Sequence, residues 1–178
     1  MSLISFSSFP VLITARLILR RLRLTDAPDI MRIRSDKRVN EFLDRPVSTD
    51  IDQAKKFIEK IEESINGNES MYWAITLKDT DTLIGTICYW NFVVEKRQGE
   101  IGFELHPDFQ EKGFMQEALK AVIKFGLTEM RLNVIIALTK AGNSRSINLL
   151  QKNGFLPDDK NEFVSKEEAG DLLVYYCN

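Results

Sequence analysis

The stretch Glu100–Leu119, EIGFELHPDFQEKGFMQEAL, contains the residues whose types and spacing best suit chemistry. An apolar strand stops at His106-Pro107, a short polar loop follows, and Gly113 opens an amphipathic helix. The backbone N–H groups of Gln110–Met115 would converge at the positive end of that helix, where they can bind a pyrophosphate. Gly113 lets a phosphate approach closely because it has no Cβ, and Lys112 adds charge. A helix that merely begins after a loop would show the same pattern.

Two well-known phosphate-binding motifs are absent from this loop, which limits the ligands that the anion site could bind. The loop lacks the second and third glycines of the dinucleotide-binding GxGxxG motif and the Gly-Lys-Ser/Thr of a P-loop. Dinucleotide and nucleoside-triphosphate sites are therefore disfavoured. About thirty residues later the chain reads NSRSINLLQKNGF, from Asn143 to Phe155, where a helix over Asn143–Asn153 is expected to end at Gly154.

Together these two segments resemble the GNAT superfamily of N-acetyltransferases, and within it the RimJ/RimL-like branch named for ribosomal-protein N-terminal acetyltransferases. The family's CoA loop reads Gln/Arg-x-x-Gly-x-Gly/Ala, which the chain matches from Gln110 to Gly113, with Met115 at the last small position. The family's fourth helix reads N-x-x-S and ends K-x-G-F, matched here by Asn143, Ser146, Lys152, Gly154 and Phe155. The segments TARLILRRL, MYWAI, LIGTI and EIGFEL also follow the branch's pattern, so the resemblance runs from about residue 13 to the end.

The resemblance implies an α/β (α+β, mixed-sheet) fold, the GNAT acyl-CoA N-acyltransferase fold. Six to seven mostly antiparallel strands and four helices are expected, in the order β-α-α-β-β-β-α-β-α-β-β. In this family the fourth and fifth strands diverge beside the loop, and the pantetheine arm of acetyl-CoA pairs with the exposed backbone like an added strand. Acetyl-CoA is thus the expected cosubstrate. The residues expected to bind it are Leu105, His106, Gln110, Glu111, Lys112, Gly113, Phe114, Met115 and Asn143.

The resemblance also implies a role for particular groups in that set. The pantetheine arm would pair near Phe103–His106, and a backbone N–H close to Leu105 would donate to the acetyl oxygen as an oxyanion donor. The loop backbone of Gln110–Met115 would hold the pyrophosphate, and Asn143 would reach the CoA arm.

Acyl transfer to an amine needs a base, because an amine is protonated at pH 7 and must lose a proton before it attacks. Glu104, on the strand that faces the thioester, is the first candidate and Glu100 the second. Their spacing of four places both on one face of the strand, so the strand period cannot separate them. A solvated strand carboxylate is the alternative for each, and a water relay is a further route for the proton.

The leaving thiolate needs a proton donor, and here the chain departs from the commonest GNAT pattern. Many members carry tyrosine four residues before the helix-ending glycine, where this chain has Leu150. Ser146, one turn earlier, is the residue that the RimL-like branch offers instead. It is expected to hydrogen-bond the sulfur as the thiolate departs. A serine bonded to its own helix backbone is the competing interpretation.

Other conspicuous residues have simpler interpretations. The single histidine, His106, precedes a proline without a serine or cysteine partner, so we expect it to contribute only backbone. The aromatic set Phe103, Phe109 and Phe114 is expected in the core. The arginines are expected on a solvated strand face, with phosphate or RNA contact as the alternative: Arg16, Arg20, Arg21 and Arg23.

The composition is that of an ordinary globular protein, with 44% hydrophobic and 28% charged residues among 178. The length suits a single N-acetyltransferase domain over residues 1–178. The formal net charge of -2 gives no general attraction to nucleic acid or anionic membranes. One histidine makes a zinc site unexpected, and Cys88 and Cys177 have no metal-site spacing, so a disulfide is not expected but is left open. With no basic n-region and no long apolar run, the chain is expected to be cytoplasmic.

Hydrophobic periodicity predicts the elements that position these residues. A first strand is expected over Arg16–Leu24, with a bulge or strong twist because its leucines do not alternate cleanly. A helix capped at Thr25 or Asp26 should run to about Ser35, and one capped at Thr49 or Asp50 should end at Asn66-Gly67. The remaining strands are predicted at Met71–Lys78, Leu83–Phe92, Glu100–Leu105, Asn133–Thr139 and Leu172–Tyr176, and the remaining helices from Gly113 and over Asn143–Asn153.

The function that best fits is an acetyl-CoA-dependent N-acetyltransferase acting on a primary amine, either a protein N-terminus or a small molecule, through a ternary complex. In this fold the acceptor side is built by Lys37–Thr49 and Pro157–Gly170, which follow no substrate rule. A catalytically silent acyl-CoA-binding or sensor domain is the alternative, motivated by Leu150 and Met115. A nucleic-acid-binding module is disfavoured, no membrane partner is expected, and a homodimer is left open.

Overall fold

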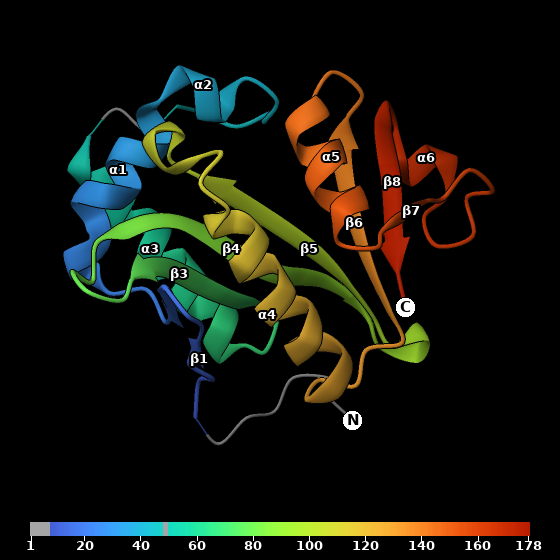
Figure 1. The fold of residues 1–178 in the computed structure, drawn as a ribbon, viewed down its shortest axis with the longest axis horizontal. Helices are drawn as coiled ribbons and strands as arrows, with labels where there is room; N and C mark the ends of the chain where they lie inside the picture. Colours follow the sequence, from blue (N-terminus) through green and yellow to red (C-terminus); the bar gives the residue numbers. More distant parts are fainter. Residues whose placement is uncertain (1–7, 48–49) are drawn as a thin grey trace.

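The computed structural model describes residues 8–47 and 50–178. Within them a mixed sheet runs through the whole molecule (Figure 1). Its strands are β1 (Leu12–Ile13), β2 (Leu17–Arg20), β3 (Met71–Leu77), β4 (Leu83–Val93), β5 (Gln98–Leu105), β6 (Val134–Lys140), β7 (Leu156–Pro157) and β8 (Leu172–Cys177). Their spatial order is β1-β2-β3-β4-β5-β6-β8-β7, and every neighbouring pair is antiparallel except β5 and β6. The described residues thus hold eight strands, two of them with only two residues each, where six to seven were expected.

Helices cover both faces of this sheet (Figure 1). They are α1 (Ala27–Ser35), α2 (Lys37–Asn40), α3 (Ile51–Asn66), α4 (Phe114–Thr128), α5 (Ser144–Lys152) and α6 (Lys166–Ala169), with short 3-10 turns η1 (Leu24–Asp26), η2 (Val94–Lys96) and η3 (Pro107–Phe109). Helices α4 and α5 pack on one face over the main core, which includes Trp73, Val122 and Leu150. Helices α1 and α3 pack on the other face, around Ile30 and Ile58.

The apolar spacing predicted in the long helices explains this layering. In α4 the residues Met115, Ala118 and Val122 are buried, as expected for one stripe of a 3.6-residue period. In α3 the carboxylate of Asp50 caps the first turn by accepting a hydrogen bond from the N–H of Gln53 at 2.9 Å. Thr49, the other cap candidate, lies outside the described residues.

The prediction for the first strand was wrong in extent. The strand ends at Arg20, and the chain then turns through η1 instead of continuing to Leu24. Leu17 and Leu19 face the α4 side of the sheet, whereas Leu22 packs among α1 and α3. The uneven leucine pattern therefore marks the end of a strand, not a bulge. The short helices α2 and α6 and the short strands β1 and β7 were also missed, because two to four residues carry no readable period.

The expectation of a solvated arginine face was also wrong for part of the set. Arg20 is 6% exposed, and its guanidinium pairs with Asp26 at 2.8 Å and with Asp81 at 2.9 Å. Arg21 pairs with Glu62 on α3 at 2.6 Å. These side chains tie the strand to its neighbouring helices and turns, so their charges are already balanced within the protein.

Candidate active site

The central feature of the site is the divergence of β5 from β6. The parallel pairing of these strands ends at Glu100 and Ile136. Beyond that point β5 stays paired with β4 up to Leu105, and β6 stays paired with β8 up to Lys140. The facing edges of residues 101–105 and 137–140 are therefore not paired with each other, on the side of the sheet that leads to the loop before α4.

The backbone groups that face this gap follow from the alternation of a strand. His106 donates its N–H to the carbonyl of Ile84 on β4 at 2.8 Å. Because successive residues point to opposite sides, the N–H groups of Leu105 and Phe103 point toward the gap. The carbonyl of His106 accepts the N–H of Phe109 at 2.9 Å, so both backbone groups of His106 bond within the protein. This removes the reason to assign His106 to cofactor binding, while Leu105 keeps a free donor.

The loop before α4 has the geometry of an anion site. Glu111 and Gly113 both lie in the left-handed region, with φ of 61° and 78°. Alternation of this kind turns successive N–H groups toward one concave point. Within the described residues, none of the N–H groups from Glu111 to Gln116 donates a hydrogen bond to the protein. The N–H of Gln110 instead donates to Pro107, so the cradle begins one residue later than the sequence suggested.

Gly113 is required for a reason that the sequence did not reveal. Its φ of 78° is costly for any residue with a side chain, and a Cβ there would lie 3.4 Å from the Nη2 atom of Arg16. From the sequence, a side chain at this position was expected only to collide with a phosphate. The nearest group is in fact the guanidinium of Arg16, the residue before β2.

Arg16 is a part of the site that sequence reasoning missed. Its Nη1 donates to the carbonyl of Lys112 at 2.9 Å, its Nε pairs with Glu117 at 2.7 Å, and its guanidinium lies over the Phe114 ring at 4.4 Å. Thr14 also donates to Glu117 at 2.6 Å. The side chain therefore clamps the loop onto the first turn of α4 from a position 96 residues away in the chain. The local motif gave no signal of this contact.

Gln110 joins the loop to both sides of the gap. Its Nε2 donates to the carbonyl of Leu105 at 3.0 Å, and its Oε1 accepts from Arg145 on α5 at 3.1 Å. The ammonium of Lys112 donates to the carbonyl of Asp108 at 2.7 Å, which holds it beside the loop. Arg145 is exposed at this edge, and it is a second cationic residue that was not singled out from the sequence.

The side chains of Phe114 and Met115 serve the core, while their N–H groups belong to the loop. Met115 is 7% exposed and packs into the main core, and Phe114 packs against the same core with Phe109. Phe103 also packs there, so the aromatic set lies at the core as expected.

The α5 residues begin where the sequence placed them. Asn143 caps α5 by accepting the N–H of Ser146 at 3.1 Å, so its carbonyl oxygen is used and its amide NH₂ stays free within the described chain. The hydroxyl of Ser146 makes no hydrogen bond there either, so the backbone-bonded alternative finds no support. Leu150 is completely buried in the main core. A tyrosine at that position would have to place its ring inside a packed interior.

Glu104 lies at the centre of a polar cluster on the α1 and α3 face. Its side chain is 7% exposed, and its Oε2 pairs with Nη1 of Arg45 at 2.6 Å. Its Oε1 accepts the hydroxyl of Thr86 at 3.2 Å, and Thr86 in turn meets the Tyr72 hydroxyl at 2.9 Å. Burial, and then the nearby Glu104 carboxylate, raise the pKa of Tyr72 well above its usual value. Arg45 and Tyr72 come from distant segments and were not predicted.

Glu100 occupies a different environment on the same strand face. Its Oε2 accepts a hydrogen bond from the amide of Asn91 at 2.9 Å, and it sits where the β5–β6 pairing ends. Burial raises the pKa of Glu100 above its usual value, against the opposing effect of the Asn91 and Trp90 hydrogen bonds. Among the described residues Glu100 has no arginine partner. The two carboxylates therefore have different surroundings, although their spacing on the strand makes them equivalent.

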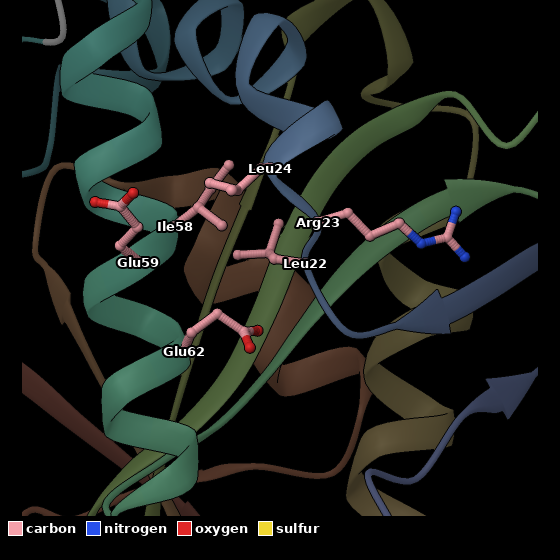
Figure 2. Close-up of a pocket in the computed structure, with 6 residues that line it drawn as sticks. All are labelled: Leu22, Arg23, Leu24, Ile58, Glu59 and Glu62. Atoms are coloured by element: carbon pink, nitrogen blue, oxygen red, sulfur yellow. The ribbon is translucent and has the colours of Figure 1, made fainter.

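Other candidate sites in the molecule lie apart from this gap. A hollow between η1 and α3 is lined by Leu22, Arg23, Leu24, Ile58, Glu59 and Glu62 (Figure 2). It receives no residue from β5 or β6. Across the described ranges, no three His, Cys, Asp or Glu side chains gather as a metal site would require. Both cysteines are free, and burial raises the pKa of Cys88 and Cys177 to about 12. No helix in the described part of the chain is long and apolar enough to cross a membrane.

The comparison with protein families agrees with this arrangement of strands and loop. The family described as acetyltransferase (GNAT) domain matches residues 16–156. The chain is thus an enzyme of the acyltransferase class. It belongs to the GNAT family and is an N-acetyltransferase.

Two curated relatives are similar to the chain over most of their length. An uncharacterized N-acetyltransferase of Bacillus licheniformis, p20, is 35% identical over 153 residues, which cover 83% of this chain and 85% of the relative. The uncharacterized N-acetyltransferase YoaA of Bacillus subtilis is 33% identical over 147 residues, with 83% of each chain covered. These relatives show the family but name no acceptor.

Solved structures show the same fold. RimL, described as a ribosomal L7/L12 alpha-N-protein acetyltransferase in complex with coenzyme A, superposes with a TM-score of 0.80 at 16% identity, covering 94% of this chain and 97% of RimL. A GNAT-family acetyltransferase from Bacillus anthracis has a TM-score of 0.76 at 24% identity, covering 94% of this chain and 96% of that chain. The expected GNAT fold is confirmed, with the mostly antiparallel mixed sheet.

Proposed function

We propose that the protein transfers an acetyl group from acetyl-CoA to the nitrogen of a primary amine, by direct attack in a ternary complex. The main support for this proposal is the unpaired edge of β5, together with the N–H groups of Glu111–Gln116 that have no partner in the described chain. An extended pantetheine arm fits the first group and a pyrophosphate fits the second. The GNAT family uses acetyl-CoA, and these two features would have to serve it here.

In this proposal the chain's own groups divide the work. The N–H groups of Glu111 to Met115 would hold the pyrophosphate, with Lys112 and Gln110 supporting the loop. The amide NH₂ of Asn143, the residue that caps α5, would reach the CoA arm. When bound, acetyl-CoA supplies the activated acetyl thioester. The N–H of Leu105 would donate to its carbonyl oxygen and thereby stabilise negative charge on that oxygen.

Proton transfer is assigned to two further residues. Glu104 would accept the proton of the amine, directly or through water, and Glu100 is the alternative base. The unbonded hydroxyl of Ser146 would donate to the departing sulfur. The acceptor amine would enter from the Lys37–Thr49 side, which contributes Arg45 to the Glu104 cluster.

The experiment is a thiol-release assay with acetyl-CoA and a panel of amines. The proposal expects free thiol only when a suitable amine is present, with one acetylated amine formed per thiol. Binding of acetyl-CoA without thiol release from any amine would instead indicate an acyl-CoA-binding domain, and would refute the proposed reaction.

A further inference from the structure

The ion pair between Arg45 and Glu104 has an unusual setting. Both side chains are mostly buried, at 18% and 7% exposed, and they join the acceptor-side segment to the candidate base across 2.6 Å. The Nε of Arg45 donates to the side-chain amide oxygen Oδ1 of Asn40 at 2.7 Å. Asn40 in turn donates to the carbonyls of Arg34 and Asp36 at 2.9 and 2.8 Å. The guanidinium is therefore held in one orientation by Asn40, the last residue of α2, which is itself bonded to the end of α1.

One terminal nitrogen of this guanidinium is left over. Nη2 of Arg45 is buried and has no hydrogen-bond partner among the described residues, although Nη1 and Nε both do. A charged donor that is buried without an acceptor is unfavourable, so a group that accepts from it would bind there with a gain. A carboxylate suits this position because one of its oxygens can accept from the free Nη2 while the other competes for Nη1, as the planar fork of a guanidinium allows.

The charge around Glu104 also favours an anion. A second arginine, Arg34, lies close by, with its guanidinium 3.9 Å from the centre of the Phe57 ring. The pKa of Arg34 is lowered, mainly by burial. The charge of Glu104 opposes this shift, and the charge of Arg45 adds to it. The charges of both Glu104 and Arg45 act on Arg34, whereas the Glu104 carboxylate is ion-paired with Arg45. The hydroxyl groups of Thr86 and Tyr72 add no charge. The cluster carries an excess of one positive charge.

We propose that Arg45 binds a carboxylate of the acceptor, so that the natural acceptor is a small amine that also carries a carboxylate, such as an amino acid. This inference rests on the proposed acetyl transfer and names its substrate class. A carboxylate on Arg45 competes with Glu104 for the guanidinium, and the weakened pair leaves the Glu104 carboxylate oxygens available to the acceptor amine. As the acceptor nitrogen bonds to the acetyl carbon it gives its proton to Glu104, and the electron pair of the broken C–S bond leaves with the sulfur.

The test is a one-pot competition between an amino acid and its own carboxamide, repeated across the standard amino acids, with acetyl-CoA and product identification by mass spectrometry. The amide is the weaker base and has more neutral amine at pH 7, so without recognition it would react faster. The wild-type protein is expected to prefer the carboxylate roughly 10- to 100-fold, the range for a charge-assisted hydrogen bond. Because both acceptors share one tube, the ratio is independent of how much protein is folded.

Two variants of Arg45 and one matched control complete the design. Arg45→Gln is expected to lose the preference while the KM for acetyl-CoA stays unchanged, and Arg45→Lys is expected to keep part of it. Arg23→Gln, which removes an exposed arginine paired with Asp81 at 3.0 Å, should keep the full preference. An equal loss of rate for acid and amide in Arg45→Gln would overturn the inference, since Arg45 would then only orient Glu104.

Preferential acetylation of peptide N-termini, whose carboxylate lies far from the amine, would also overturn it. Failure of the proposed function has a different signature, because then no amine of either kind would release thiol from acetyl-CoA.

Discussion

Replacing Arg16 by glutamine should weaken acetyl-CoA binding although Arg16 lies just before β2 and outside the loop motif. The change removes the ion pair with Glu117, the bond to the Lys112 carbonyl and the contact with the Phe114 ring. Arg16 is 47% exposed, so its ion pair is screened by solvent and contributes only about 0.2–1 kcal/mol. The cation–π contact adds about 0.5–1 kcal/mol.

Together these contacts stabilise the ordered loop by at most about 0.7–2 kcal/mol. If that order is lost in the free protein, it must be restored on binding, and the dissociation constant of CoA should rise about 3- to 30-fold. Calorimetric titration of CoA into wild type, Arg16→Gln and Arg16→Lys measures this directly. Arg23→Gln, an arginine on the same segment but away from the loop, is the matched control.

Kinetics provide an independent check. The KM for acetyl-CoA should rise in Arg16→Gln while kcat changes little, because the loop is remote from the reacting atoms. Glu117→Gln should have a smaller effect, since the Arg16 bond to Lys112 remains. An unchanged dissociation constant in Arg16→Gln, with a lower melting temperature of the free protein, would refute the reasoning and leave Arg16 as a fold-stabilising residue only.

Three further outcomes follow from the proposed roles. Gly113→Val should abolish the thermal protection that CoA confers while the free protein still folds, because valine is strained at a φ of 78°; full protection would exclude the loop assignment. Glu104→Gln should lower the rate more at pH 7 than at pH 9, where more of the amine is already neutral, and parallel pH–rate profiles would transfer the role to Glu100 or a water relay. Ser146→Ala should lower kcat roughly 10- to 100-fold with little change in the KM for acetyl-CoA. A raised KM with constant kcat would make Ser146 a cofactor-binding residue.

Local sequence signals were sufficient to predict the long elements and the loop. Elements such as α3 and α4 have a clear apolar period, and Asp50, Asn143 and Gly113 mark their beginnings by capping chemistry that acts over three or four residues. The order of motifs then identified the family, which the comparisons confirmed. These features depend on neighbours in the chain, so the chain alone reveals them.

The sequence could not separate Glu100 from Glu104, nor could it find the residues around them. Strand period places both carboxylates on one face, and only packing gives Glu104 an arginine partner and gives Glu100 an amide. Arg45 reaches Glu104 across 59 positions of the chain, and Arg16 reaches the loop across 96. No short-range pattern encodes such pairs, because their distance is set by the strand order and by the helices packed on it.

The gap between β5 and β6 was likewise predictable only in part from the sequence. The sequence predicted two apolar strands, a helix that begins at a glycine, and the anion-binding loop between them. The divergence of β5 and β6 was expected from the family resemblance. In the structure it begins after Glu100 and Ile136, because β5 stays paired with β4 while β6 stays paired with β8. Hydrogen bonding to different partners pulls the two strands apart, and only the assembled sheet shows which backbone groups are left to bind a ligand.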